Sequence, residues 1–438
     1  MKLSTTRPIS GARDFLPKDM LFKKWLFQIW DTVSKNHGFL EYDAPILEYA
    51  ELYTIKHGNS DILDEMFSFN FDSKVLALRP EMTPSLARMM IDYLPTEVLP
   101  AKLYSKPQCW RNENLSRGRK REFYQWNVDI FGCTDVKSEI DLFLIIIDFF
   151  NKLLIGSQHI VIKISDKRIL QDFFNSLGFE CETTSQIFKI IDKAGKTTKP
   201  DLVQKLVEIG LNSDSTEKLI QLISCNSLSE LEHNPIVSNN IAVVQLKTLF
   251  DYLDMLGLKG WVELDLKIVR GLNYYTGLVF EVFSRDGQLK RAICGGGRYD
   301  NMMLDYGYAE TIPTIGFGLG DVVIYELLFD LNLLPQEQIE FDYVLIPFDD
   351  SFYLDAVKLA QQIRNKNKSV LIHNFEIGAK QIVKRGFTYA NKNNAKFVIL
   401  FAPDEFSEGF IMIKDSKLQH VKGYRGSKSK IQDFLDGL

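Results

Sequence analysis

Cysteine is scarce in this chain, with five residues in 438. The five stand far apart and form no CxxC pair: Cys109, Cys133, Cys181, Cys225 and Cys294. Structural zinc sites need closely spaced ligands, and disulfide frameworks belong to oxidising compartments, so the pattern argues against both and suits a reducing cytosol. The six histidines are scattered as well. We therefore expect no metal site built from protein ligands alone.

Long apolar runs are also missing. No stretch of about 18 apolar residues appears, and the N-terminal segment MKLSTTRPISGARDF has no apolar core of the kind that a signal peptide needs. We expect a cytoplasmic protein with no membrane segment.

A strong excess of one charge is absent too. The net charge is −5, and apolar and charged residues make up 45% and 25%, which is typical of a soluble globular protein with two or three domains at this length. Residues 341–438 carry about 15 basic against about 11 acidic residues. This modestly basic tail is compatible with RNA contact, although small surface domains often carry such a charge.

The densest run of chemistry lies between Trp110 and Gly132, in WRNENLSRGRKREFYQWNVDIFG. Arg111 follows a strand-like run, and an alternating run follows a basic loop, so the segment predicts an antiparallel hairpin. Guanidinium groups bind phosphate oxygens through bidentate, permanently charged contacts, which suits a polyphosphate ligand. A solvated charged hairpin explains the same residues equally well.

Three separated blocks carry a resemblance to a known family. The hairpin resembles motif 2 of class II aminoacyl-tRNA synthetases, and in detail that of histidyl-tRNA synthetases. Val269–Gly277 (VRGLNYYTG) is similar to the histidine-binding signature of that family, and Cys294–Asp300 (CGGGRYD) to its glycine-rich strand and turn. The resemblance implies an α+β fold with an antiparallel sheet core flanked by helices.

An apolar helix pattern ending at Gly38, followed by a strand-like run with Pro45, resembles motif 1 of the family. Motif 1 builds the dimer interface in class II synthetases, so the resemblance implies a homodimer. An ordinary helix–strand pair explains the pattern equally well.

Two further patterns suggest how histidine is held. Glu81 and Thr83 follow a strand, and a carboxylate and a hydroxyl two residues apart can converge on one amine; Thr83 is alternatively the cap of the next helix. Gln125 and Asp129 lie on the same face of a strand, and a buried Asp129 needs either a ligand or an internal donor. The resemblance assigns Glu81, Thr83 and Gln125 to the α-groups of L-histidine and Asp129 to its imidazole.

The same resemblance supplies the remaining site residues. Arg111 and Arg270 are the implied catalytic cations, reaching the histidine carboxylate and the α-phosphate from opposite sides. Tyr274 and Tyr275 shape the histidine pocket. The implied ATP ligands are Arg111, Glu113, Arg119 and Arg121. The implied reaction joins histidine to ATP, with Mg²⁺ neutralising the phosphates, and then transfers histidine to tRNA(His).

The chain departs from the family at two positions. Asn273 stands where many members have Asp, and Val323 stands where motif 3 has an arginine that holds the γ-phosphate of ATP. A branch found in plant organelles and some bacteria shares the overall pattern. The arginine-rich loop, with Arg117, Arg119 and Arg121, is therefore expected to hold the γ-phosphate together with Mg²⁺.

The expected domains are a catalytic core from 1–165 and 262–332, a helical insertion at 166–261, and a C-terminal α/β domain at 341–438 that resembles anticodon-binding domains. The rival function is a synthetase-like regulatory subunit without aminoacylation, such as the partner of ATP phosphoribosyltransferase. Such partners generally lack the C-terminal domain, which favours the enzyme. An unrelated α/β ligand-binding protein would leave three ordered motifs unexplained.

Overall fold

The computed structural model describes residues 5–55, 61–179, 181–192, 197–269, 274–286, 289, 291–336, 338–373, 381–417 and 426–438. They divide into two compact units. Met1–Asp14 and Lys24–Leu334 form the first, and Phe15–Lys23 with Pro335–Leu438 form the second. No helix among these residues is long and apolar enough to cross a membrane.

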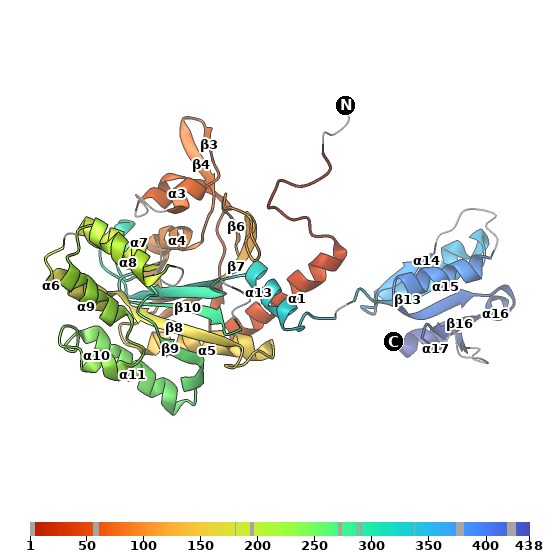
Figure 1. Ribbon diagram of the computed structural model, residues 1–438. Helices are drawn as coiled ribbons and strands as arrows, with labels where there is room; N and C mark the ends of the chain where they lie inside the picture. Colours follow the sequence, from red (N-terminus) through yellow and green to blue (C-terminus); the bar gives the residue numbers. More distant parts are fainter. Residues whose placement is uncertain are drawn as a thin grey trace. The chain divides into compact units, whose positions relative to one another are not determined.

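A nine-stranded sheet is the centre of the first unit (Figure 1). Its order is β1-β5-β7-β12-β11-β10-β8-β9, and β6 pairs with β7 beside this path. The strands are β1 (Leu40–Glu41), β5 (Ala101–Ser105), β6 (Gln108–Trp110), β7 (Glu122–Phe131), β8 (Ile160–Asp166), β9 (Val262–Leu264), β10 (Leu278–Ser284), β11 (Cys294–Arg298) and β12 (Thr314–Gly320). The neighbours from β5 to β8 run antiparallel, which agrees with the expected class II core.

The hairpin predicted around the basic loop is confirmed. β6 and β7 pair antiparallel, with Trp110 opposite Glu122, so residues 111–121 form the loop between them. The strand-like run with Pro45, expected as part of motif 1, forms two strands instead of one. Pro45 lies between β1 and β2 (Leu47–Tyr49) and interrupts the run. Proline has no N–H to donate to a ladder. β2 joins β4 (Lys74–Leu78) and β3 (Ser68–Phe71) in a separate sheet.

Helices α1 (Pro17–Asn36) and α5 (Lys137–Lys152) supply much of the core. The rings of Trp30 and Trp126 stack at 6.2 Å, and the Trp126 indole donates to Ser34 Oγ at 2.9 Å. The expectation that Thr83 caps a helix is wrong. Helix α4 (Thr83–Tyr93) begins after Met82, and no side chain caps it.

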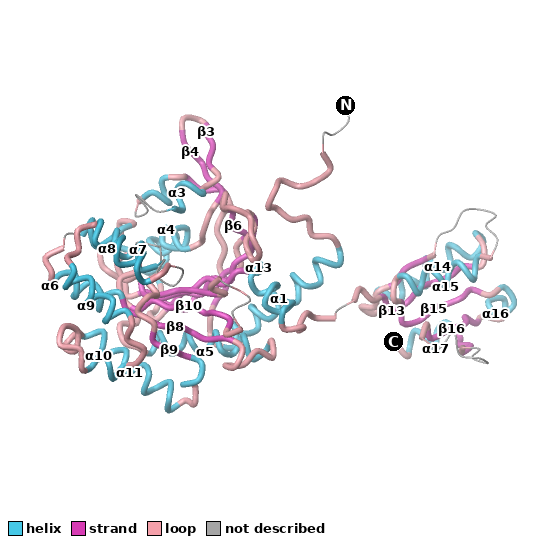
Figure 2. Tube along the Cα trace, viewed as in Figure 1, coloured by secondary structure: helices cyan, strands magenta, loops and turns pink. Residues whose placement is uncertain are grey.

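The segment from 167 to 255 is helical, as its amphipathic pattern predicts. It contains α6 (Lys167–Ser176), α7 (Cys181–Asp192), α8 (Lys199–Glu208), α9 (Ser213–Ile223), α10 (Leu228–Glu232) and α11 (Ile241–Met255). Figure 2 shows these helices gathered at one side of the sheet. Helix α11 packs against α5, α6 and α10, which ties the segment to the core.

The glycine run Gly295–Gly297 is part of the buried strand β11, as its resemblance to the glycine-rich strand of the family implies. A Cβ at Gly297 would lie 2.6 Å from the Leu278 carbonyl oxygen, and one at Gly296 would overlap the backbone of β12. Side chains are excluded here because three strands approach too closely.

The second unit holds a five-stranded sheet of order β14-β13-β15-β16-β17, in which β13 pairs parallel with β14 and β15. Its elements are β13 (Phe341–Pro347), α14 (Tyr353–Arg364), β14 (Val370–Ile372), α15 (Ile382–Lys392), β15 (Ala395–Phe401), α16 (Pro403–Ser407), β16 (Phe410–Asp415), β17 (Ser427–Lys430) and α17 (Ile431–Asp436). The elements from β13 to β15 form a βαβαβ unit, which agrees with the expected α/β domain, and the antiparallel strands β16 and β17 extend it to a mixed sheet.

Candidate active site

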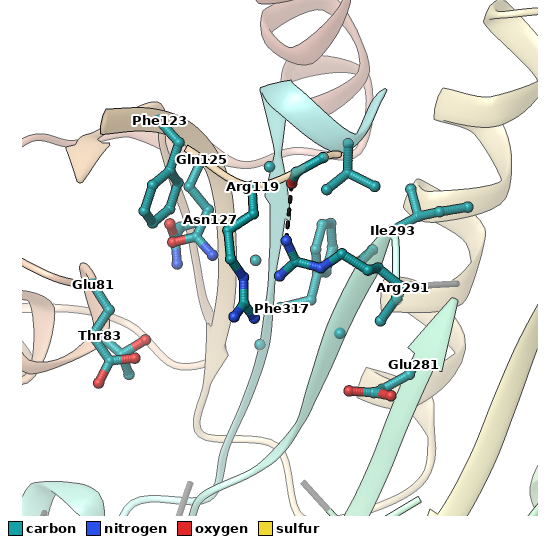
Figure 3. A pocket seen from close by; sticks show the side chains of 18 of the residues that line it. Glu81, Thr83, Arg119, Phe123, Gln125, Asn127, Glu281, Arg291, Ile293 and Phe317 are labelled. Carbon is teal, nitrogen blue, oxygen red and sulfur yellow. Dashed lines mark hydrogen bonds between the residues drawn. The ribbon is translucent and has the colours of Figure 1, made fainter. Parts of the chain in front are cut away.

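A cavity of about 880 Å³ opens over β7, β10, β11 and β12. Most residues assigned from the sequence line it: Glu81, Thr83, Arg111, Glu113, Arg119, Gln125, Asp129, Tyr274 and Tyr275. Arg121 is not among the lining residues, and Arg270 lies outside the described residues. Figure 3 shows Glu81 and Thr83 at one side and two arginine side chains at the centre.

The acidic side of the cavity begins where β4 leads into α4. Glu81 and Thr83 are both buried there. The Tyr274 hydroxyl donates to Glu81 Oε2 at 3.4 Å, and Arg111 Nε donates to the Pro80 carbonyl at 2.9 Å. The strand-to-helix turn and the hairpin arginine are therefore held together.

One face of β7 presents three polar side chains, Gln125, Asn127 and Asp129, because successive residues of a strand alternate between faces. Gly316 and Gly318 of the neighbouring β12 make room, since a Cβ at either would overlap Asp129 or Gln125. Within the described part of the chain, Gln125 Oε1 and Asn127 Oδ1 are buried without a hydrogen bond. Buried amide oxygens of this kind suit a ligand with donor groups.

Asp129 combines burial with an internal donor. Burial raises the pKa of this carboxyl to about 7, and the hydroxyls of Tyr299 and Tyr42 oppose the rise. The Tyr299 hydroxyl donates to Asp129 Oδ1. The internal donor expected for a buried carboxylate is thus present, and Asp129 also lines the cavity.

Tyr299→Phe should raise the pKa of Asp129 further, because the lost hydrogen bond favours the ionised form. If the carboxylate accepts from the substrate imidazole, histidine affinity falls as pH drops through this pKa. The acidic limb of the affinity profile should then move to higher pH in the variant. Calorimetric titration of histidine from about pH 5.5 to 8.5 measures it. The imidazole of the substrate titrates identically in both proteins, so superimposable limbs would contradict the assignment.

The three loop arginines have different surroundings. Arg117 pairs with Glu326 at 2.8 Å and also with Asp330, both on α13 (Asp321–Asp330). Arg121 Nη1 donates to the Ser10 carbonyl at 3.3 Å. Arg119 faces the cavity and pairs with Glu113. The structure therefore brings Arg119 to the cavity, and the expected contact between the basic loop and the γ-phosphate stays a prediction that depends on Arg119.

The start of α13 anchors this region. The carboxylate of Asp321 accepts from the Tyr124 amide at 2.9 Å and pairs with Arg13 at 2.8 Å. Burial raises the pKa of Asp321, and the Arg13 guanidinium opposes this rise. Two residues later, the Val323 side chain lines the cavity. Asp321 thus has a packing role that the sequence did not indicate.

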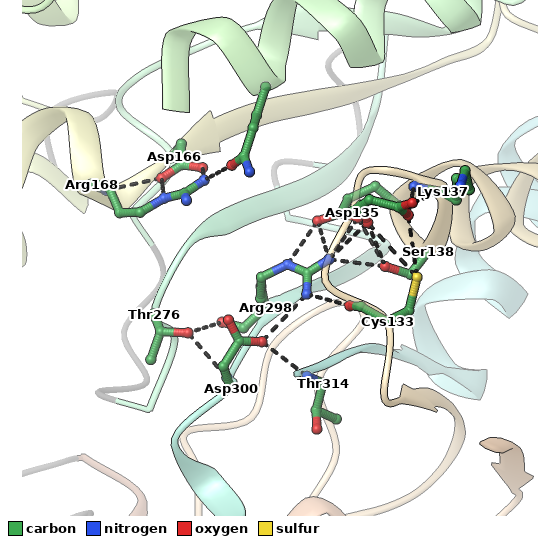
Figure 4. Close-up of polar contacts among 12 residues, drawn as sticks. Cys133, Asp135, Lys137, Ser138, Asp166, Arg168, Thr276, Arg298, Asp300 and Thr314 are labelled. Atoms are coloured by element: carbon green, nitrogen blue, oxygen red, sulfur yellow. Dashed lines mark hydrogen bonds and ion pairs between the residues drawn. The ribbon is translucent and has the colours of Figure 1, made fainter. Parts of the chain in front are cut away.

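A buried ion pair between Arg298 and Glu139 holds the C-terminal end of β11 (Figure 4). Arg298 Nη2 donates to Glu139 Oε1 at 2.6 Å and to Ser138 Oγ at 2.9 Å, and Nη1 donates to the Cys133 carbonyl at 2.9 Å. Burial raises the pKa of Glu139, and Arg298 opposes that rise. The contact fixes the strand end from which Tyr299 reaches Asp129. Sequence reasoning missed this pair, because 159 residues separate its members.

Sequence reasoning also missed Asn127 and Arg291, which line the cavity. The period-two spacing from Gln125 to Asp129 was enough to find Asn127. No comparable signal marks Arg291, which lies three residues before the glycine-rich strand.

Comparison with known proteins identifies the family of this chain. Residues 11–320 match the family model described as histidyl-tRNA synthetase. The chain belongs to the histidyl-tRNA synthetase family. The resemblance expected from the three motifs is therefore confirmed.

Relatives of this synthetase family span nearly the whole chain. The chain is 37% identical over 408 residues to the chloroplastic/mitochondrial histidine–tRNA ligase of Arabidopsis thaliana, covering 93% of this chain and 82% of the relative. It is 30% identical over 435 residues to the histidine–tRNA ligase of Leptospira biflexa, covering 98% of each.

A crystal structure of histidyl-tRNA synthetase from Nostoc sp. PCC 7120 has a TM-score of 0.77 at 23% identity, covering 100% of this chain and 99% of that one. A Bacillus halodurans protein described as an ATP phosphoribosyltransferase regulatory subunit/histidyl-tRNA synthetase has a TM-score of 0.74 at 19% identity, covering 91% and 99%. At these identities the likeness confirms the fold alone.

Proposed function

We propose that this chain is a histidine–tRNA ligase, which activates L-histidine with ATP to histidyl-adenylate and transfers histidine to the 3′ end of tRNA(His). The observation that carries the proposal is one cavity lined by both buried carboxylates and arginines, in a chain of this family. ATP–pyrophosphate exchange with each of the twenty amino acids tests it. Exchange with histidine alone is expected, and no exchange with any would overturn it.

The acidic side of the cavity suits the amino acid. Glu81, Thr83 and Gln125 supply oxygens toward the α-ammonium group, and the buried Gln125 Oε1 is an acceptor for it. Asp129 and Tyr275 also line the cavity, and their carboxylate and hydroxyl groups suit hydrogen bonds with the imidazole nitrogens. A pocket that pairs both ends of histidine rejects analogues that lack either set of groups.

The arginine side suits the reacting phosphate. A carboxylate oxygen of histidine attacks the α-phosphorus, the bond to pyrophosphate breaks, and negative charge builds on the nonbridging oxygens. Arg111, held by the Pro80 carbonyl, is a preorganised cation for that charge. Arg270 is proposed as its opposite partner on the sequence pattern alone.

Mg²⁺ is proposed to accompany ATP and to neutralise its phosphates. Among the described residues no group of three or more His, Cys, Asp or Glu could hold a metal ion. Mg²⁺ bound with a nucleotide needs only one or two carboxylates besides phosphates and water. Glu113 and Glu281 line the cavity and fit that requirement.

A homodimer is proposed from exposed apolar residues on the sheet β2-β4-β3. They are Leu47 at 42% exposure, Tyr49 at 47%, Phe69 at 48% and Phe71 at 58%, and their pairing with alternate residues of β4 places them on one face of the sheet. An exposed apolar face of this kind is typical of a protein interface. Sedimentation over a range of concentrations measures the mass in solution, and a monomer throughout would contradict the proposal.

The second unit and the helical segment are proposed to contact tRNA. The C-terminal domain at 341–438 has the mixed sheet and modestly basic charge expected of an anticodon-binding-like domain. The helical insertion at 166–261 is proposed to lie near the acceptor arm. The cytoplasm stays our proposal for the compartment, although the Arabidopsis relative is named for organelles.

Removing residues 341–438 should separate the two half-reactions. We expect histidine-dependent exchange to persist, because all the site residues lie in the first unit. The kcat/KM for tRNA charging should fall by at least about tenfold, the equivalent of about 1.4 kcal/mol of lost binding. Both assays should use truncated protein of verified folding. Equal charging kinetics with and without the domain would contradict its role.

The regulatory alternative is not favoured. The relatives at 30–37% identity are histidine–tRNA ligases, and they cover most of this chain, including its C-terminal domain.

A further inference from the structure

Fewer cations are available to the γ-phosphate of ATP than the sequence pattern of the basic loop indicates. Val323 is aliphatic, and Arg117 and Arg121 are engaged outside the cavity. Arg119 faces the cavity, but Glu113 already pairs with it. The γ-phosphate leaves within pyrophosphate when histidine attacks the α-phosphorus, and cations that contact it stabilise the charge of that leaving group.

Arg291 approaches this place from a different part of the chain. Its Nη1 donates to the Gly118 carbonyl at 3.1 Å, at the tip of the basic loop. A Cβ built on Gly118 would lie 3.7 Å from Val323 Cγ2 and 4.0 Å from Arg291 Cδ. Both side chains therefore approach Gly118 at the tip of the basic loop, so Arg291 and the residue that replaces the motif 3 arginine border the same part of the loop. Figure 3 shows the guanidinium groups of Arg291 and Arg119 in the same part of the cavity.

Three arginines lie around the Glu113 carboxylate at this place. Within the described residues Arg291 forms no ion pair, and Glu113 is shared between Arg119 and Arg111, the latter at 3.7 Å. Burial lowers the pKa of Arg291, and the charges of Arg119 and Arg111 lower it further. Three guanidinium groups at one side of a cavity attract a ligand with several negative charges, as a triphosphate has.

We propose that Arg291 binds the γ-phosphate of ATP and takes the place of the cation that position 323 lacks. The proposal rests on ATP being the substrate of this site. Arg291 acts with Arg119 across the terminal phosphate, while Arg111 serves the α-phosphate. Guanidinium suits this role because its planar donors contact two phosphate oxygens at once and remain charged when partly buried.

Direct nucleotide binding tests the proposal independently of catalysis. Calorimetry should compare ATP with AMP for the full-length protein and for Arg291→Gln. We expect the variant to lose about ten- to a hundredfold in ATP affinity, the usual loss for one charge-assisted contact, with AMP affinity unchanged. Unchanged AMP binding also shows that the cavity is still folded. An equal loss for both nucleotides would indicate only a loop tether through Gly118 and would overturn the proposal, as would unchanged ATP affinity.

Two further variants sharpen the result. Arg291→Gln with Val323→Arg returns a cation to the neighbouring position, and we expect it to recover part of the lost ATP affinity without affecting AMP. Arg385→Gln removes an exposed arginine from the second unit and should change neither nucleotide. Histidine-dependent exchange in the unaltered protein separates the two proposals. If exchange is absent while ATP affinity still depends on Arg291, the enzyme assignment fails and the phosphate site stands.

Discussion

Arg111→Gln should lower the rate of histidyl-adenylate formation by roughly 10²- to 10³-fold, the usual loss when one preorganised donor to a transition-state charge is removed. Arg111 lines the cavity, its Nε donates to the Pro80 carbonyl, and its Nη1 lies 3.7 Å from Glu113 Oε1, so the guanidinium is held in place beside the cavity. Glutamine keeps a donor and most of the length but cannot neutralise the α-phosphate. Pre-steady-state measurement of adenylate formation at saturating histidine and ATP gives the rate.

The same loop provides a matched control. Arg121→Gln removes the same charge ten residues away, where the side chain contacts the Ser10 carbonyl outside the cavity. We expect a much smaller loss of rate for this variant. Similar losses in both variants would indicate a general effect of charge and would count against a specific role for Arg111. Arg111→Lys should rescue little, because an ammonium group cannot reproduce bidentate contact.

Asp129→Ala should lower kcat/KM for histidine by at least about a hundredfold while leaving the KM for ATP nearly unchanged. A site built to pair a polar substrate group loses selectivity steeply when its own partner is removed. Asp129 is buried, and Gly316 pairs with it on the neighbouring strand β12. A side chain at Gly316 would overlap Asp129, so the glycine leaves room for the carboxylate. Exchange kinetics with varied histidine, then varied ATP, separate the two effects.

Asp141→Ala is the control for this variant, since Asp141 is a surface acid on α5 that pairs with Lys102. Its kinetic constants should match those of the unaltered protein. Thermal unfolding should accompany both, because the Tyr299 hydroxyl loses its acceptor in Asp129→Ala. Unchanged histidine KM and kcat in a folded Asp129→Ala protein would remove Asp129 from the site.

Much of the candidate site follows from local sequence. The alternation of β7 places Gln125 and Asp129 on one face, and the hairpin follows from two strand patterns around a basic loop. The helices between 167 and 255 follow from amphipathic spacing, although the short α10 was missed. These features depend on neighbours within a few residues, which is the range over which period and propensity are informative.

The functions of the glycines and arginines depend on the tertiary structure. Glycine has little strand propensity, so the pattern at Gly296 and Gly297 allowed a turn, and only the close approach of β10 and β12 makes it a strand. The arginines of the basic loop carry the same charge, so the sequence did not show which of them lines the cavity and which pairs elsewhere.

By itself the sequence determined the family, the order of the motifs and the residue types around the cavity. The tertiary structure decided which cations meet there. Arg117 is drawn away by acids on α13 more than two hundred residues later, and Arg291 reaches the loop tip from 173 residues away. The physical reason is that a long side chain is oriented by the charges and hydrogen-bond partners around it. Those partners come together only when distant segments pack.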